Sequence, residues 1–257
     1  MKKFGLLGEK LSHSWSCLIH SIIYDQYDLD ANYELLECSE NDLKEYITLL
    51  RQGVYTGFNV TIPYKKTIMK YLDEVSELAL KIGSVNTIYL KDGKVIGTNT
   101  DYYGFKEELS YYNVDCVNKM AYVLGTGGAS LAISSVLKDL GAKVIIVSRT
   151  PITSSISYED LNEKNDIDIL VNTTPVGMFP KVGYSPVSEE VAKKSKVVVD
   201  IIFNPLKTKL LEDANSDYHG LYMLVGQAIE AERIWFDLDI NISIGDVVDE
   251  VIRRKGL

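Results

Sequence analysis

The segment that most constrains the fold lies near the middle of the chain, where an apolar stretch runs into a glycine-rich turn. The letters MAYVL at residues 120–124 predict a buried strand, GTGGAS at residues 125–130 predict a turn, and residues 129–140 predict a helix. Further strands are expected at residues 143–148, 167–171 and 196–200. Strands and helices that alternate in this way form parallel βαβ units with right-handed crossovers. We therefore predict a Rossmann-type, doubly wound sheet for this part of the chain.

The residues before this segment predict a separate α/β unit. Its strands are expected at residues 4–8, 33–38, 57–62, 85–90 and 94–98, and its helices at residues 16–27 and 41–50. The pair Asp92-Gly93 between the last two strands is a strong signal for a hairpin. Ser39 is a candidate N-cap for the second helix.

A domain boundary near Asp101 separates these two parts, so that residues 1–101 form one domain and residues 102–221 the other. Two last helices are expected at residues 224–236 and 244–254. The residues of these helices leave open which of the two domains they join.

Composition argues against two classes of partner. The chain of 257 residues has 36 acidic and 27 basic side chains and a net charge of −9, so it has no chain-wide basic surface for nucleic acid. No apolar stretch approaches the ~20 residues of a membrane helix. The three cysteines form no C-x-x-C pair, which fits a reducing compartment. We expect a cytoplasmic protein whose partner is a small molecule.

The glycine-rich turn is a candidate dinucleotide site, because it follows a predicted strand and opens a predicted helix. Gly125 would allow the tight turn, and Gly127 would let the backbone approach a pyrophosphate. The helix N-terminus then offers free N–H groups to the phosphates. Ser130 stands where the usual fingerprint has its third glycine, and a packing turn without a ligand is the alternative interpretation.

Arg149 favours NADP over NAD as the ligand of this turn. It lies with Ser148 and Thr150 at the end of the strand expected at residues 143–148. An NAD site usually has Asp or Glu at this place, to bind the ribose 2′-hydroxyl. A guanidinium instead pairs with a 2′-phosphate. A surface arginine without a ligand is the alternative.

Three polar clusters in the first domain have more hydroxyls and amides than a fold requires. In SHSWS at residues 12–16, Ser14 and Ser16 could face a carboxylate, although Ser16 could also only cap the following helix. In NVTIPYK at residues 59–65, Asn59 and Thr61 lie two apart in a strand and so face the same side.

The third cluster brackets the hairpin and places Asn86, Thr100 and Asp101 at strand ends, where function concentrates. Reduction of a ketone develops negative charge on its oxygen, which must also receive a proton. A lysine beside an aspartate can polarise that carbonyl and deliver the proton. Lys65 and Asp101 are our candidates, and the spacing alone does not exclude Lys66 in place of Lys65.

These residues resemble the shikimate dehydrogenase family over nearly the whole chain. The resemblance is carried by these segments, in order: HSWS at 13–16, NVTIPYK at 59–65, VNT at 85–87, NTDYYG at 99–104, the paired glycines at 127–128, NTTPVGM at 172–178, DIIFNPLKT at 200–208 and GLYMLVGQA at 220–228.

The resemblance implies reversible NADPH-dependent reduction of 3-dehydroshikimate to shikimate, with no metal. It implies that Lys65 is the catalytic acid/base, paired with Asp101. The implied substrate-binding residues are Ser14 and Ser16 for the carboxylate, and Thr61, Asn86, Asp101 and Gln227 for the ring hydroxyls, with Asn59 in support. Lys65 and Phe203 are also implied to contact the substrate. The implied cofactor-binding residues are Gly125, Thr126, Gly127, Gly128, Ala129, Ser148, Arg149, Thr150, Thr173, Ile201 and Gly220. It also implies that the final helices, residues 222–257, return to the first domain.

Four departures from the family pattern bear on these expectations. Cys17 replaces a usual proline, and Phe203 replaces a tyrosine, so that one hydroxyl is lost. Glu232 replaces an aromatic residue in the last motif. No lysine or arginine follows Arg149 in residues 151–156, which weakens the argument for NADP alone.

Two alternatives therefore stay open. One is a quinate/shikimate dehydrogenase that also accepts NAD, and the other is a nucleotide-binding regulatory module without catalysis, against which the intact Lys65 and Asp101 argue. The sequence also leaves open whether the protein is a monomer or a homodimer.

Overall fold

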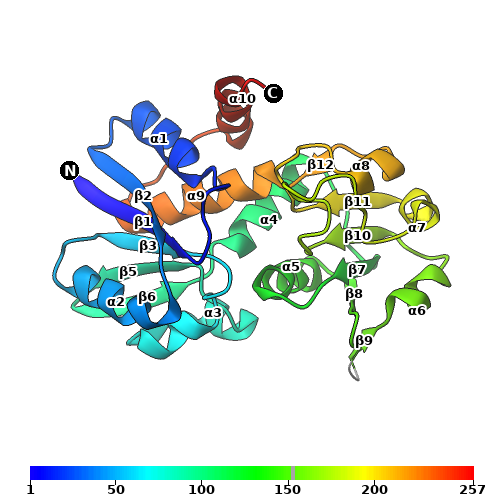
Figure 1. The fold of residues 1–257 in the computed structure, drawn as a ribbon, viewed down its shortest axis with the longest axis horizontal. Coiled ribbons are helices and arrows are strands. Elements are labelled where there is room, and N and C mark those ends of the chain that lie inside the picture. The colour runs from blue at the N-terminus through cyan, green and yellow to red at the C-terminus, as the bar shows by residue number, and fades with distance from the viewer. Residues whose placement is uncertain (152–153) are drawn as a thin grey trace. The chain divides into compact units, whose positions relative to one another are not determined.

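The computed structural model describes residues 1–151 and 154–257 of the chain. The chain divides into two compact units, each with its own sheet (Figure 1). Unit 1 consists of Met1–Gly104 and Val225–Leu257, and unit 2 consists of Phe105–Leu224. The divisions fall within α4 (Asp101–Tyr111) and α9 (Leu221–Phe236).

A six-stranded mixed sheet forms the centre of unit 1, in the order β2-β1-β3-β5-β6-β4. β1 pairs in parallel with β2 and β3, whereas β5 pairs antiparallel with β3 and β6. The strands are β1 (Lys2–Gly8), β2 (Ala31–Glu37), β3 (Gly57–Val60), β4 (Glu74–Val75), β5 (Thr87–Lys91) and β6 (Lys94–Thr98).

Helices and apolar clusters cover this sheet. One buried cluster joins Leu43 and Leu50 of α2 to Phe58 and Val60 of β3. Another joins β1 and β2 to Trp235 of α9. The helices are α1 (Ser16–Tyr27), α2 (Leu43–Arg51), α3 (Glu77–Ile82) and α10 (Ile244–Lys255), with 3₁₀ turns at Glu40–Asp42 and Thr67–Tyr71.

Unit 2 is a parallel sheet in the order β12-β11-β10-β7-β8-β9. Counted from β7, this is the 3-2-1-4-5-6 order of the doubly wound dinucleotide-binding fold, whose switch point lies between β7 and β10. The strands are β7 (Met120–Leu124), β8 (Lys143–Val147), β9 (Ser155–Ile156), β10 (Ile169–Asn172), β11 (Val197–Asp200) and β12 (Tyr218–His219).

The helices of unit 2 connect these strands. α6, α7 and α8 share one buried cluster with alternate residues of the strands, such as Tyr122 and Leu124. The helices are α5 (Gly128–Asp139), α6 (Tyr158–Asn162), α7 (Glu189–Lys194) and α8 (Lys209–Ala214). The prediction of a Rossmann-type sheet in this part of the chain is confirmed.

Most of the expected elements form, with changes at their ends. The Asp92-Gly93 hairpin is confirmed, and both residues have positive φ, as its turn requires. Ser39 does begin a helical segment, but that segment opens as a 3₁₀ turn before α2. β3 ends at Val60 and not at residue 62, since Ile62 is exposed and the following Pro63 has no N–H for a ladder.

No helix among residues 1–151 and 154–257 is long and apolar enough to span a membrane. The same residues contain no cluster of His, Cys, Asp and Glu side chains that could hold a metal ion.

Candidate active site

Lys65 and Asp101 meet in unit 1. The Lys65 Nζ lies 2.5 Å from the Asp101 Oδ2, and 14% and 7% of the two side chains are exposed. Lys65 follows β3 in the loop after Pro63, and Asp101 is the first residue of α4. The neighbouring Lys66 is exposed. The structure therefore brings together the cation and carboxylate that the sequence analysis singled out, with Lys65 beside Asp101 and Lys66 on the surface.

Asn86 fixes the second oxygen of Asp101. Its Nδ2 donates to Asp101 Oδ1 at 2.8 Å, and its Oδ1 accepts from the backbone N–H of Thr100 at 2.7 Å. Both Asn86 and Asp101 are buried. The carboxylate thus has one oxygen toward an ammonium and the other toward an amide, which limits the free-energy cost of burying its charge.

Asn59 belongs to the same buried network. Its Nδ2 donates to Thr87 Oγ1 at 3.0 Å, and the Thr87 hydroxyl donates to Asn86 Oδ1 at 3.0 Å. The Thr100 hydroxyl lies 2.9 Å from that of Thr87 and 3.5 Å from Gln227 Oε1 of α9. The sequence analysis singled out Thr100 at its strand end, whereas Thr87 appeared there only within a quoted motif.

Ser14 and Ser16 lie together at the start of α1. The Ser14 hydroxyl donates to Ser16 Oγ at 3.0 Å and accepts from the Ser16 backbone N–H at 3.2 Å. The interpretation of Ser16 as a helix cap is wrong, because α1 already includes Ser16 and its N-cap residue is Trp15. Both hydroxyls thus remain candidates for a ligand.

Thr61 directly follows β3. A Cβ on Gly8 would lie 2.7 Å from the Thr61 methyl group, so a glycine is needed for this close approach of the chain. The backbone N–H of Thr61 donates to Leu7 O at 2.9 Å, which continues the sheet pairing past the end of the strand.

The histidines lie outside the Lys65–Asp101 network. His20 is fully buried against Glu232 of α9, with 2.5 Å between Nδ1 and Oε1, while His13 is exposed.

The glycine-rich turn in unit 2 follows β7 and opens α5. Gly125 has φ +111, and a Cβ there would lie 2.9 Å from Thr173 Oγ1, so this position requires glycine. A Cβ on Gly127 would meet nothing within 4 Å. Gly127 is also the N-cap of α5 and provides no side-chain cap, unlike Ser157 and Ser188 at α6 and α7. The first N–H groups of α5 thus receive no side-chain cap from their N-cap residue, which fits a pyrophosphate.

The other residues of the turn have definite structural roles. Ser130, at the place of the missing third glycine, donates to Gly125 O at 2.7 Å and thereby closes the turn. Thr126 is exposed, and Gly128 and Ala129 are half-buried in the first turn of α5.

Arg149 is exposed in a tight turn after β8. The Ser148 hydroxyl accepts from the backbone N–H of Thr150 at 3.1 Å and donates to Thr150 O at 3.1 Å. Burial raises the pKa of the Tyr158 phenol in α6, and the positive charge of Arg149 partly offsets this rise. The sequence has no lysine or arginine in residues 151–156. Two of these residues, 152 and 153, lie outside the described part of the chain.

Asp200, at the end of β11, joins three segments of unit 2. It accepts from Asn172 Nδ2 at 3.0 Å, from the Ile202 backbone N–H at 3.1 Å and from the Thr208 hydroxyl at 2.7 Å. None of these donors has a charge. Burial therefore dominates and raises the pKa of Asp200 to about 7.

Thr173 and Gly220 lie close to the ends of these strands. Thr173 follows β10, and its hydroxyl donates to Leu124 O at the end of β7, across the switch point. Gly220 packs against the backbone of Ile201, where a Cβ would lie 2.0 Å from the carbonyl oxygen. Phe203, three residues beyond the end of β11, is half-buried.

Three buried residues with polar contacts were missed as functional candidates. Asp200 was quoted only as the first letter of a motif, Glu108 not at all, and Tyr33 only as the start of a strand. Asp200 contacts Thr208, Glu108 contacts the backbone of Met223 and Tyr33 contacts Asn59, which are 8, 115 and 26 residues away in the sequence. No local pattern therefore marks these contacts.

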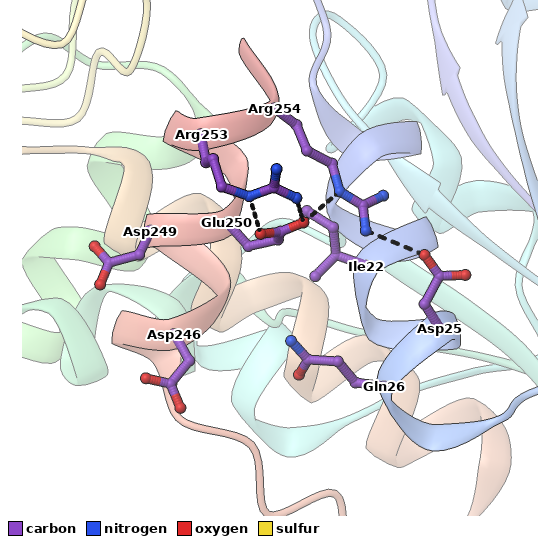
Figure 2. A pocket seen from close by; sticks show the side chains of 8 residues that line it. All are labelled: Ile22, Asp25, Gln26, Asp246, Asp249, Glu250, Arg253 and Arg254. Atoms are coloured by element: carbon purple, nitrogen blue, oxygen red, sulfur yellow. Dashed lines mark hydrogen bonds and ion pairs between the residues drawn. The ribbon is translucent and has the colours of Figure 1, made fainter. Parts of the chain in front are cut away.

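A surface pocket lies apart from these residues, between α1 and α10 of unit 1 (Figure 2). Its two arginines are already paired. Arg253 contacts Glu250 at 2.6 Å, and Arg254 contacts Glu250 at 2.6 Å and Asp25 at 3.3 Å. None of the predicted site residues lines it.

Comparisons with known proteins agree in one family. Residues 6–88 match a family model described as the shikimate dehydrogenase substrate binding domain. The NADP(+)-dependent shikimate dehydrogenase of Clostridium beijerinckii is 42% identical over 94% of this chain and 94% of its own length.

Solved structures give the same result. The crystal structure of shikimate dehydrogenase 1 from Peptoclostridium difficile is 41% identical, with a TM-score of 0.90 and 99% of each chain covered. The shikimate 5-dehydrogenase of Thermus thermophilus, solved with NADP(H) and shikimate, is 30% identical, with a TM-score of 0.86 and 99% of each chain covered.

Proposed function

Because this chain belongs to the shikimate dehydrogenase family, we propose that it catalyses the reversible NADPH-dependent reduction of 3-dehydroshikimate to shikimate. The observation that carries the proposal is the buried contact of Lys65 with Asp101, whose other oxygen is held by Asn86. A regulatory module without catalysis would have no need for a buried cation and carboxylate in this arrangement, since burying charges costs free energy.

The side chains of unit 1 supply the acid/base chemistry. When bound, NADPH would supply the hydride to the carbonyl carbon. Lys65 polarises the carbonyl, and its Nζ gives a proton to the oxygen as negative charge develops there. Asp101 holds the Nζ in place and compensates its charge. In the reverse direction Lys65 takes the proton from the hydroxyl of shikimate.

The polar network around this pair would bind the substrate. Ser14 and Ser16 offer two adjacent hydroxyls to the carboxylate. Thr61, Asn86, Asp101 and Gln227 would bind the ring hydroxyls, with Asn59 in support. At Phe203 the hydroxyl that the family often has is absent, so the protein relies on the remaining groups.

Unit 2 would bind NADP(H), with unit 1 as the substrate domain. The pyrophosphate would lie on the backbone of Gly125, Thr126, Gly127, Gly128 and Ala129. The 2′-phosphate would pair with Arg149 beside the hydroxyls of Ser148 and Thr150. Thr173, Ile201 and Gly220 would contact the remainder of the cofactor, the last two near the nicotinamide.

We further propose that the enzyme works in the cytoplasm as a monomer or homodimer. Its three cysteines are free thiols, which suits a reducing compartment.

Initial rates with two substrates and two cofactors test the proposal. Purified protein should reduce NADP with shikimate much faster than with quinate, and faster than it reduces NAD. Comparable rates with quinate or NAD would support a quinate/shikimate dehydrogenase. Tight NADP binding with no turnover of shikimate in either direction would refute the enzymatic function.

A further inference from the structure

Three buried residues next to the proposed substrate pocket have no part in the roles given above. They are Tyr33 of β2, His20 of α1 and Glu232 of α9. His20 and Glu232 are completely buried, and Tyr33 is 7% exposed. All three belong to unit 1.

The Tyr33 hydroxyl joins two residues of the proposed pocket. It donates to Asn59 Oδ1 at 2.7 Å, and the nearby Ser16 hydroxyl lowers the pKa of Tyr33 against the larger effect of burial. Burial raises the pKa of Tyr33 well above its usual value, so the hydroxyl keeps the proton that it donates. The tyrosine hydroxyl therefore lies beside a group proposed to bind the carboxylate and holds a group that supports the ring site.

The bond from Tyr33 decides how the Asn59 amide is turned. With Oδ1 occupied by the tyrosine, Nδ2 points to Thr87 Oγ1 and to Asn86 O, at 3.0 and 3.3 Å. Asn86 in turn holds Asp101. Hydrogen bonds thus run without a break from Tyr33 to the carboxylate that pairs with Lys65.

His20 holds the ring of Tyr33 in place. The two rings stack with centroids 3.8 Å apart and an interplanar angle of 10°. The His20 Nδ1 lies 2.5 Å from Glu232 Oε1, which fixes the plane of the imidazole. Glu232 stands where the family usually has an aromatic residue, so this support differs from the common pattern.

We propose that Tyr33 is a positioning residue for the substrate pocket, which holds the Asn59 amide in the orientation that shikimate requires. His20 and Glu232 fix the tyrosine ring from behind. The proposal rests on the proposed function and adds to it a residue that orients the substrate-binding groups from outside the pocket.

Steady-state kinetics of Tyr33→Phe test this role. The variant keeps the ring stacked on His20 and removes only the hydroxyl. We expect the KM for shikimate to rise about two- to tenfold, as the loss of one hydrogen bond predicts. The KM for NADP should stay unchanged, and kcat should change less than the KM for shikimate, because the affected groups bind the substrate before and during the reaction alike.

Tyr24→Phe is the matched control. Tyr24 is 6% exposed in the same aromatic cluster, but its buried hydroxyl has no hydrogen bond to any residue of the proposed pocket among the described residues. The KM for shikimate should therefore be that of the unsubstituted protein. If both variants raise this KM equally, Tyr33 acts only through the packing of the cluster, and the proposal is overturned.

A double variant with Asn59→Ala separates positioning from general destabilisation. If Tyr33 acts through Asn59, the rise in KM for the double variant is smaller than the product of the two single effects. A rise in KM equal to that product contradicts the proposal, and so does a Tyr33→Phe variant with a lower Tm and an unchanged KM. Absence of shikimate-dependent NADP reduction in the unsubstituted protein instead refutes the proposed function, and the Tyr33 role with it.

Discussion

Asp200→Asn should change the dependence of stability on pH. Asp200 is fully buried at the end of β11, and the donors that hold it are an amide, a backbone N–H and a hydroxyl. An asparagine keeps the size of the side chain and can keep these contacts, since its Nδ2 can donate to the Thr208 hydroxyl. The substitution therefore removes a titratable group with little change in packing.

The sign follows from the direction of the pKa shift. Asp200 has a pKa of about 7 in the folded chain, against 3.8 for an ordinary aspartate. Its contribution to folding is fully present below the lower value and is lost as the pH rises through the higher one. A shift of ~3 units corresponds to roughly 4 kcal/mol. About 3 kcal/mol of that loss falls between roughly pH 5 and pH 8.5.

Glu108 is the ionisable neighbour to consider. It is fully buried in α4, and its pKa is raised well above the usual value, mainly by burial and also by the charge of Asp200. The Asp200→Asn substitution removes this charge, so the pKa of Glu108 shifts toward its usual value in the variant.

Urea unfolding of both proteins, followed by fluorescence from pH 5 to 8.5, measures the effect. The difference in unfolding free energy between wild type and variant should change by about 3 kcal/mol across this range, with the wild type losing stability as the pH rises. Titrations of groups that do not interact with Asp200 are common to both proteins and cancel in the difference. A difference that stays constant with pH would refute the reasoning.

Three further predictions concern the two proposed binding sites. Lys65→Ala should lower kcat by ~10²–10⁴-fold with little change in KM, whereas Lys66→Ala should leave both constants unchanged. Equal losses of kcat in the two variants, measured in steady-state assays, would contradict the role of Lys65. Arg149→Gln should raise the KM for NADP about tenfold and leave that for NAD unaltered, as paired assays with the two cofactors would reveal. Gly127→Ala should weaken NADP binding in calorimetry but keep the Tm, because its Cβ enters open space. Gly220→Ala should instead lower the free energy of unfolding by about 1–3 kcal/mol, because its Cβ would meet the backbone of Ile201.

The sequence predicts those parts of the fold whose signals are local. The α1 helix and the β7 strand have the predicted bounds, Ser16–Tyr27 and Met120–Leu124, because periodic apolar residues and clear breaks mark both. Short helices such as α6 and α7 were not predicted. Each has only five or six residues, and helices of this length are stable mainly through packing on a sheet.

Serine caps could have found those short helices. Ser157 begins a capping box with Asp160, and Ser188 caps α7 through the backbone N–H of Val191. The pattern of a serine followed three residues later by an acidic residue is a known signal for a helix start, and it is present at Ser157 but not at Ser188. The signal is weak in a segment without apolar periodicity, and these two helices bury only Leu161, Val191 and Ala192.

The site shows more sharply what a sequence can and cannot predict. Asp101 is the first residue of α4, Asp200 is the last residue of β11, and both are buried. Their neighbours differ, since Asp101 lies against the ammonium of Lys65, whereas Asp200 meets only uncharged donors and titrates near neutrality. The identity of an aspartate gives its ordinary pKa, but partners that are distant in the sequence decide whether it remains an anion. The Lys65–Asp101 pair was predictable because a reaction that protonates a ketone oxygen requires a cation near a carboxylate. No such requirement points to Asp200 or Tyr33, and only the folded chain identifies their partners.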